Sequence, residues 1–181
     1  MQRPTRRAWP AVRTTRNKAR RQPSRLNQEN LMNTSVIERL VATDDRWSPL
    51  ALRIPVGIVF AAHGAQKLFG WFGGYGLEGT GQWMASIGLA PGYMMALLAG
   101  SAEFFGGLAL VLGLLVRPAA AALAFAMLVA ILSVHIDKGF FMSNNGYEFG
   151  LALLVVAVSL AISGGGRASL DAVLQRHAPG R

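Results

Sequence analysis

Four long apolar segments follow one another from residue 50 onward. A helix that crosses a bilayer needs about 20 mainly apolar residues. The pattern therefore predicts spans over Leu50–Phe69, Pro91–Val116, Pro118–Ile136 and Tyr147–Ser163, the last slightly short. The rival interpretation is a soluble bundle, but the third and fourth segments lack the charged face that a soluble helix carries. We therefore predict an all-α fold, an integral membrane four-helix bundle.

The chain before these spans has a different pattern. Residues 1–31 are rich in Arg, Pro, Gln and Asn and lack apolar periodicity, which predicts a disordered basic N-terminal tail. Met32 begins a stretch that looks like a natural start, so this tail is interpreted as sequence upstream of a misplaced start codon. Residues 32–47 predict an interfacial amphipathic helix that begins with a capping box at Ser35 and Glu38. The membrane domain is placed at 48–164 and a cytoplasmic tail at 165–181.

The connections and small residues predict further detail. In the glycine-rich connection 70–90, we expect a short helix over Thr80–Ile87, with Thr80 as N-cap and Gly88 as the stop. Four aromatic residues there are expected at headgroup depth: Trp71, Phe72, Tyr75 and Trp83. Small residues that would allow close helix packing are Gly100 and Gly107, then Ala122, Ala126 and Ala130, then Ala157 and Ala161.

Charge is concentrated at the start of the chain. The chain has 181 residues, of which 52% are hydrophobic and 15% charged, and its net charge is +9. Residues 1–49 hold 11 of the 18 Lys and Arg residues and 4 of the 9 acidic residues, which leaves only +2 for the rest. Only Trp9 and Trp47 lie among these cations, too few for the aromatic interleaving typical of nucleic-acid binding, so no nucleic-acid partner is predicted. Lys and Arg in the loops predict that both termini are cytoplasmic.

Ionisable residues inside the predicted spans are candidates for function, because they are costly in a bilayer. They are Arg53, His63, Lys67, Glu103, His135 and Glu148. The catalytic candidates are Glu103, His63, Lys67 and Arg53. The cofactor-binding candidates are His63, Lys67, His135 and Glu148. The chain has no cysteine, which excludes a disulfide framework, an iron–sulfur cluster and a cysteine nucleophile, and we predict no metal site.

Helix geometry predicts how these residues meet. Arg53, His63 and Lys67 share an arc of about 80° on the first helix. Glu103 lies roughly 18 Å below the outer rim. We expect a buried Arg53–Glu103–His63 group that continues into an outer group of Lys67, His135 and Glu148. The alternatives are that Glu103 belongs to a structural ion pair and that the cations reach out to the headgroups.

Several short motifs resemble the DoxX family. They are Arg53-x3-Gly57-x5-His63-Gly64-x2-Lys67-Leu68, Gly88-Leu89-Ala90-Pro91, Glu103-x2-Gly106-Gly107, Leu112-Gly113-x3-Arg117, His135-x3-Gly139-Phe140-Phe141 and Gly146-Tyr147-Glu148. The resemblance covers about residues 50–160. It implies a small four-span bacterial membrane protein. The family takes its name from a subunit associated with a quinone-linked oxidase and thiosulfate oxidation, and many members are labelled as oxidoreductases.

Two classes of function follow. The first is a redox-associated membrane subunit that binds a quinone, or works with a redox enzyme partner, beside His63, Lys67 and Glu103. The second is a non-catalytic scaffold in which the same residues hold the bundle together. Transport of a small acid or proton by Glu103 is a third alternative. The residues alone do not decide whether the protein is an enzyme.

Overall fold

The computed structural model describes residues 39–43 and 45–177, and these residues form helices and connections without a strand. The predicted basic tail, and the capping box of the predicted interfacial helix, lie outside the described residues. The main helices are α2 (Ser48–Phe69), α3 (Gly76–Ser86), α4 (Gly92–Leu112), α5 (Val116–Ala130), α6 (Glu148–Ser163) and α7 (Leu170–His177). A π-helical turn, η2 (Ile131–His135), and short 3-10 turns, η1 (Trp71–Gly73), η3 (Ile136–Lys138) and η4 (Met142–Asn144), complete the described chain.

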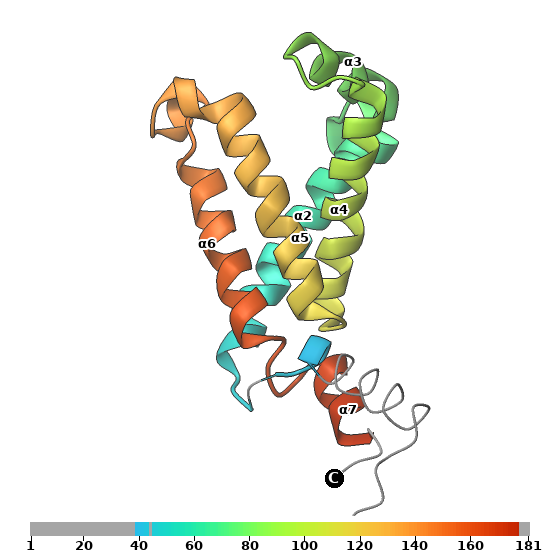
Figure 1. Ribbon diagram of the computed structural model, residues 1–181, viewed down its shortest axis with the longest axis vertical. Coiled ribbons are helices and arrows are strands. Elements are labelled where there is room, and N and C mark those ends of the chain that lie inside the picture. Colours follow the sequence, from blue (N-terminus) through green and yellow to red (C-terminus); the bar gives the residue numbers. More distant parts are fainter. Residues whose placement is uncertain (1–38, 44, 178–181) are drawn as a thin grey trace, which may run out of the picture.

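The four longest helices form a ring. α2 packs on α4, α4 on α5, α5 on α6, and α6 contacts α2. Figure 1 shows two arms that diverge upward, one made of α5 and α6 and the other of α4, α3 and the upper part of α2. We call the upper end, which carries the connections 70–91 and 136–147, the loop end. We call the lower end, with the start of α2 and with α7, the basal end.

Three helices of the described chain are long and apolar enough to cross a membrane: Ser48–Phe69, Gly92–Leu112 and Val116–Lys138. The third joins α5 to η2 and η3 without a break. α6 is apolar but has only 16 residues. The predicted all-α membrane fold is therefore confirmed, while a bilayer crossing by α6 stays a prediction.

The boundary between the second and third predicted spans was wrong. We expected one helix from Pro91 to Val116, but α4 ends at Leu112 because Gly113 adopts a left-handed conformation with φ of 70°. α5 then starts at Val116, two residues before Pro118. A proline in the first helical turn removes an N–H that would have had no partner within the helix, so the helix continues through it.

The helix in the glycine-rich connection is longer than predicted. It runs over Gly76–Ser86, so Thr80 is not its N-cap but a buried residue in its middle. Gly88 has a φ of +89° and follows the helix end, as expected of a stop. α3 packs against α4. The four predicted belt aromatics are all exposed to a large extent, from 45% at Trp83 to 85% at Tyr75.

Glycines bring α2 and α4 into backbone contact. A Cβ added at Gly107 would lie 2.4 Å from the Ala61 nitrogen, and one added at Gly64 would lie within 3 Å of the Gly100 oxygen, at 2.8 Å. No side chain could fit at these positions without separating the helices. The close approach fixes an antiparallel register, with the middle of α4 beside the loop-end half of α2.

Candidate functional site

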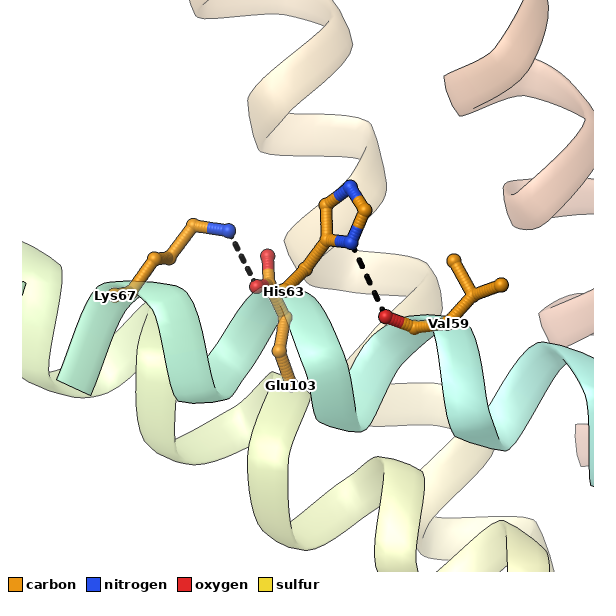
Figure 2. Close-up of polar contacts among 4 residues, drawn as sticks. All are labelled: Val59, His63, Lys67 and Glu103. Atoms are coloured by element: carbon orange, nitrogen blue, oxygen red, sulfur yellow. Dashed lines mark hydrogen bonds and ion pairs between the residues drawn. The ribbon is translucent and has the colours of Figure 1, made fainter. Parts of the chain in front are cut away.

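The central feature of the site is an ion pair between α2 and α4. Lys67 Nζ lies 2.5 Å from Glu103 Oε2. The Glu103 side chain is only 4% exposed and the Lys67 side chain 24%. Figure 2 shows the two side chains meeting on one side of α2. Glu103 is therefore neutralised by Lys67, the candidate that we had assigned to the outer group.

The packing register explains this pairing. Gly64 lies against Phe104, the residue next to Glu103, and Gly100 lies against Leu68, the residue next to Lys67. The glycines therefore place Lys67 and Glu103 at the same height on neighbouring helices. The expected packing of the second span against the first is confirmed.

A cavity of about 390 Å³ opens beside the ion pair, between the two arms of the bundle. Its walls come from α2, α3, α4, α5, η2 and α6 and are mainly apolar. Ala126 and Ala130, from the predicted small-residue stripe of α5, line it, whereas Ala122 is exposed. Their small side chains leave space instead of bringing a helix close. The volume falls in the range of small-molecule sites, about 300–1,000 Å³.

The polar side chains of the cavity include four of the predicted site residues. His63, Lys67, Glu103 and His135 all line it, together with Trp83 and Phe149. His63 Nδ1 lies 3.2 Å from the Val59 carbonyl oxygen, and His135 Nδ1 lies 2.7 Å from that of Asn145. The π-helical turn η2 ends at His135. The structure thus brings together one imidazole from each arm of the bundle and the Lys67–Glu103 pair.

Glu148, the remaining candidate for cofactor binding, has a different set of contacts. Its Oε1 atom accepts a hydrogen bond of 2.6 Å from the Met142 N–H. It stands in the first turn of α6, where a negative charge is favourable. Its neighbour Phe149 lines the cavity, but Glu148 is not among the lining residues. Glu148 holds the loop 139–147 against α6 at the rim of the site.

The predicted Arg53–Glu103–His63 group was wrong in its first member. Arg53 is 2% exposed and lies at the basal end, where it donates hydrogen bonds to backbone carbonyl oxygens. Nη1 reaches Leu110 at 2.8 Å and Val111 at 2.5 Å. Nε reaches Gly165 at 3.1 Å, and Nη2 donates to Ala168. The guanidinium therefore donates hydrogen bonds to the last turn of α4 and to the segment before α7. A cation is favourable at the last turn of a helix.

Asp171 is the partner that the sequence analysis missed, because it lies in the segment interpreted as a tail. Its carboxylate accepts hydrogen bonds from the Leu115 N–H at 2.7 Å and the Val116 N–H at 2.9 Å, at the first turn of α5. Burial raises the pKa of the Asp171 carboxyl, and these two hydrogen bonds and the charge of Arg53 oppose that rise. We call Arg53 and Asp171 the basal clamp, because together they hold both sides of the α4–α5 turn.

The family model described as DoxX matches residues 48–136, which include α2, α4, α5 and the ion pair. The chain belongs to the DoxX family. No solved structure matches this DoxX chain.

This DoxX chain aligns with most of the length of three relatives. One, from Bacillus subtilis (strain 168), carries the name "Putative oxidoreductase CatD" and is 36% identical over 67% of this chain and 83% of its own. The "Inner membrane protein YqjF" of Escherichia coli (strain K12) is 34% identical over 70% and 92%. An uncharacterized protein of Haemophilus influenzae is 35% identical over 66% and 85%. One of these relatives is thus named an inner membrane protein, and another is named a putative oxidoreductase.

Proposed function

We propose that this DoxX membrane protein is a redox-associated subunit that binds a quinone in the cavity between its two arms. The observation that carries the proposal is the Lys67–Glu103 ion pair at the wall of an apolar cavity of about 390 Å³. An ammonium group has three N–H donors. One reaches Glu103, and the others can serve the carbonyl oxygen of a quinone ring. The apolar walls, with Phe149 and Trp83, suit the ring faces.

The cavity size sets a limit on the part of the ligand that enters. A volume of about 390 Å³ is near the lower end for small-molecule sites. It suits a quinone ring with short substituents, so a long isoprenoid chain would extend between the arms into the bilayer. The residues supply no electron carrier of their own. A quinone would bring the redox chemistry, and a partner enzyme of the membrane would exchange electrons with it.

The proposed orientation places the basal end in the cytoplasm of a bacterial cell. Lys and Arg are enriched in short cytoplasmic loops. Arg117, Arg167 and Arg176 stand at the basal end, whereas Lys138 stands in the loop at the other end. The ion pair and the cavity then lie in the half of the bilayer away from the cytoplasm.

Quinone titration of the purified protein in nanodiscs tests this function. Short-chain ubiquinone and menaquinone analogues should quench tryptophan fluorescence saturably, because Trp83 lines the cavity. Replacing Lys67 by Met should weaken binding at least ten-fold, since a charged hydrogen bond contributes about 1.5–3 kcal/mol. Lys67→Arg keeps the charge and should retain part of the affinity. Lys138→Met, an exposed lysine of the loop end outside the cavity lining, is the matched control and should bind like the parent protein.

Two results would contradict quinone binding. One is the absence of saturable quenching by any analogue. The other is an equal loss of affinity in Lys67→Met and Lys138→Met. Either result would favour the scaffold alternative, in which the ion pair only fixes the packing of α2 on α4.

A further inference from the structure

The hydrogen bonds of the two cavity histidines determine which of their ring nitrogens carries a proton. His63 Nδ1 faces the Val59 carbonyl at 3.2 Å, and His135 Nδ1 faces the Asn145 carbonyl at 2.7 Å. A carbonyl oxygen only accepts hydrogen bonds, so Nδ1 must be the donor in each ring. In a neutral imidazole the other nitrogen, Nε2, then has no proton and is an acceptor.

These two histidines come from different helices that line the same cavity. His63 comes from α2 and His135 from the end of η2, and both rings line the cavity. Figure 2 shows the second ring nitrogen of His63 directed away from α2, on the side where Lys67 and Glu103 meet. Glu103 adds a further acceptor, because the short contact with Lys67 uses only its Oε2 atom.

A quinone and its reduced form differ in what they can offer to these groups. The carbonyl oxygens of a quinone only accept hydrogen bonds, whereas the two hydroxyl groups of a hydroquinone or catechol also donate. Two Nε2 acceptors in one cavity receive no hydrogen bond from a quinone, whereas a diphenol can donate one hydroxyl proton to each. A site built to accept from a hydroxyl group discriminates against a ligand that lacks it.

We infer that the cavity is selective for the reduced ligand, a single-ring aromatic diphenol whose two hydroxyl groups donate to His63 Nε2 and His135 Nε2. This rests on the proposed function, since it specifies the form of the ligand bound at the same site. Lys67 donates to one of the hydroxyl oxygens at the same time. The two histidines are thus the residues that determine specificity for the oxidation state.

Selective binding has a redox consequence. A ligand that is held more tightly in its reduced form becomes easier to reduce at the site. A ten-fold preference for the diphenol raises the midpoint potential of the bound two-electron couple by about 30 mV. This shift is a readout that a purely structural role of the histidines would not produce.

The test compares three ligands that share a tetramethyl ring under anaerobic conditions: durohydroquinone, its dimethyl ether and duroquinone. Their ring methyl groups block covalent addition to the protein. Calorimetric titration of the protein in nanodiscs should give at least ten-fold tighter binding for durohydroquinone than for the other two. Catechol and its dimethyl ether form a second arm, which shows whether the hydroxyl groups prefer neighbouring or opposite ring positions. A preference for either diphenol over its ether supports the inference.

Histidine variants supply the matched control. His63→Leu and His135→Leu should each lose most of the preference for the diphenol, measured as the ratio of the dissociation constants of duroquinone and durohydroquinone. His63→Gln, which retains an acceptor, should recover part of it. His177 makes the same kind of contact, with Nδ1 2.8 Å from the Val173 carbonyl, but lies at the basal end, so His177→Leu should change nothing.

The outcomes separate this inference from the proposed function. If duroquinone binds in a Lys67-dependent manner but the diphenol binds no more tightly, the selectivity is refuted while quinone binding stands. If His63→Leu and His135→Leu keep the full preference, the inference is refuted as well. If neither oxidation state binds, the proposed function fails and the inference fails with it.

Discussion

At the basal end, Arg53 and Asp171 contact backbone atoms of the α4–α5 turn and its surroundings, whereas nearer the loop end Lys67 and Glu103 contact each other beside a cavity. Both pairs stand in an apolar bundle, but their exposure differs. Arg53 and Asp171 are 2% and 1% exposed, and their charged groups form hydrogen bonds with backbone carbonyl and amide groups. Lys67 retains 24% side-chain exposure and hydrogen-bonding capacity that the protein does not use. The difference separates charges that hold the fold from charges available to a ligand.

The largest effect should come from removing the basal clamp. Arg53→Met removes a hydrogen bond from four carbonyl groups and the neighbouring cation from Asp171. Loss of one member of a buried charged group costs about 3–5 kcal/mol. We expect that decrease in the free energy of unfolding, measured by denaturant titration in mixed micelles. Arg176→Met, at an exposed arginine of α7, should stay within about 0.5 kcal/mol of the parent.

A medium effect is expected at the ion pair. Lys67→Met leaves the Glu103 carboxylate unpaired and should lower the free energy of unfolding by about 2 kcal/mol, less than Arg53→Met because Lys67 is partly exposed. Glu103→Gln in the same chain removes the unpaired charge and should restore most of that loss. The double variant should keep the weakened quinone binding of Lys67→Met. Equal destabilisation by Lys67→Met and Arg53→Met would contradict the distinction between the basal clamp and the Lys67–Glu103 ion pair.

The smallest effect concerns pH at the basal clamp. Burial raises the pKa of Asp171 in the folded protein, so the folded state binds its proton more readily than the unfolded state. The stability contributed by the protonated form is then fully present below the ordinary pKa of about 3.9 and is lost as pH rises through the folded value. Asp171→Asn should reduce this loss of stability with rising pH, measured as the free energy of unfolding at a series of pH values above 4. Asp137→Asn, at an exposed residue of η3, should keep the decline.

Apolar length predicted the four longest helices, and the ionisable residues within them include four of the side chains that line the cavity. Glu103 was expected to be buried against the first helix, and it is. Its partner was misassigned because the depth of each residue was counted from the start of its own helix, at Pro91 or Leu50. Such a count does not include the axial offset between the two packed helices. The register is set by backbone contacts at Gly57, Gly64 and Gly107, whose position no hydropathy pattern reports. A signal was present in the spacing of these glycines around Lys67 and Glu103.

The basal clamp was harder to predict for a different reason. Asp171 stands in a short segment of mixed polarity, and 8 residues are too few for a clear helical pattern. Its function depends on a turn at Gly113, which the sequence analysis had placed inside a continuous span. Once α4 is known to end there, the unpaired N–H groups of Leu115 and Val116 require an acceptor, and a buried Asp is the natural choice.

The basal clamp also affects the order in which the bundle assembles during synthesis. Arg53 lies in α2, but two of its acceptors, the carbonyls of Gly165 and Ala168, are 112 and 115 residues further along the chain. At about 5–20 residues per second, the ribosome needs roughly 6–22 s to make that distance. During this interval the guanidinium has only water, headgroups or the end of α4 as partners. The segment before α7 therefore completes the contacts of Arg53 only after α4, α5 and α6 have been synthesised.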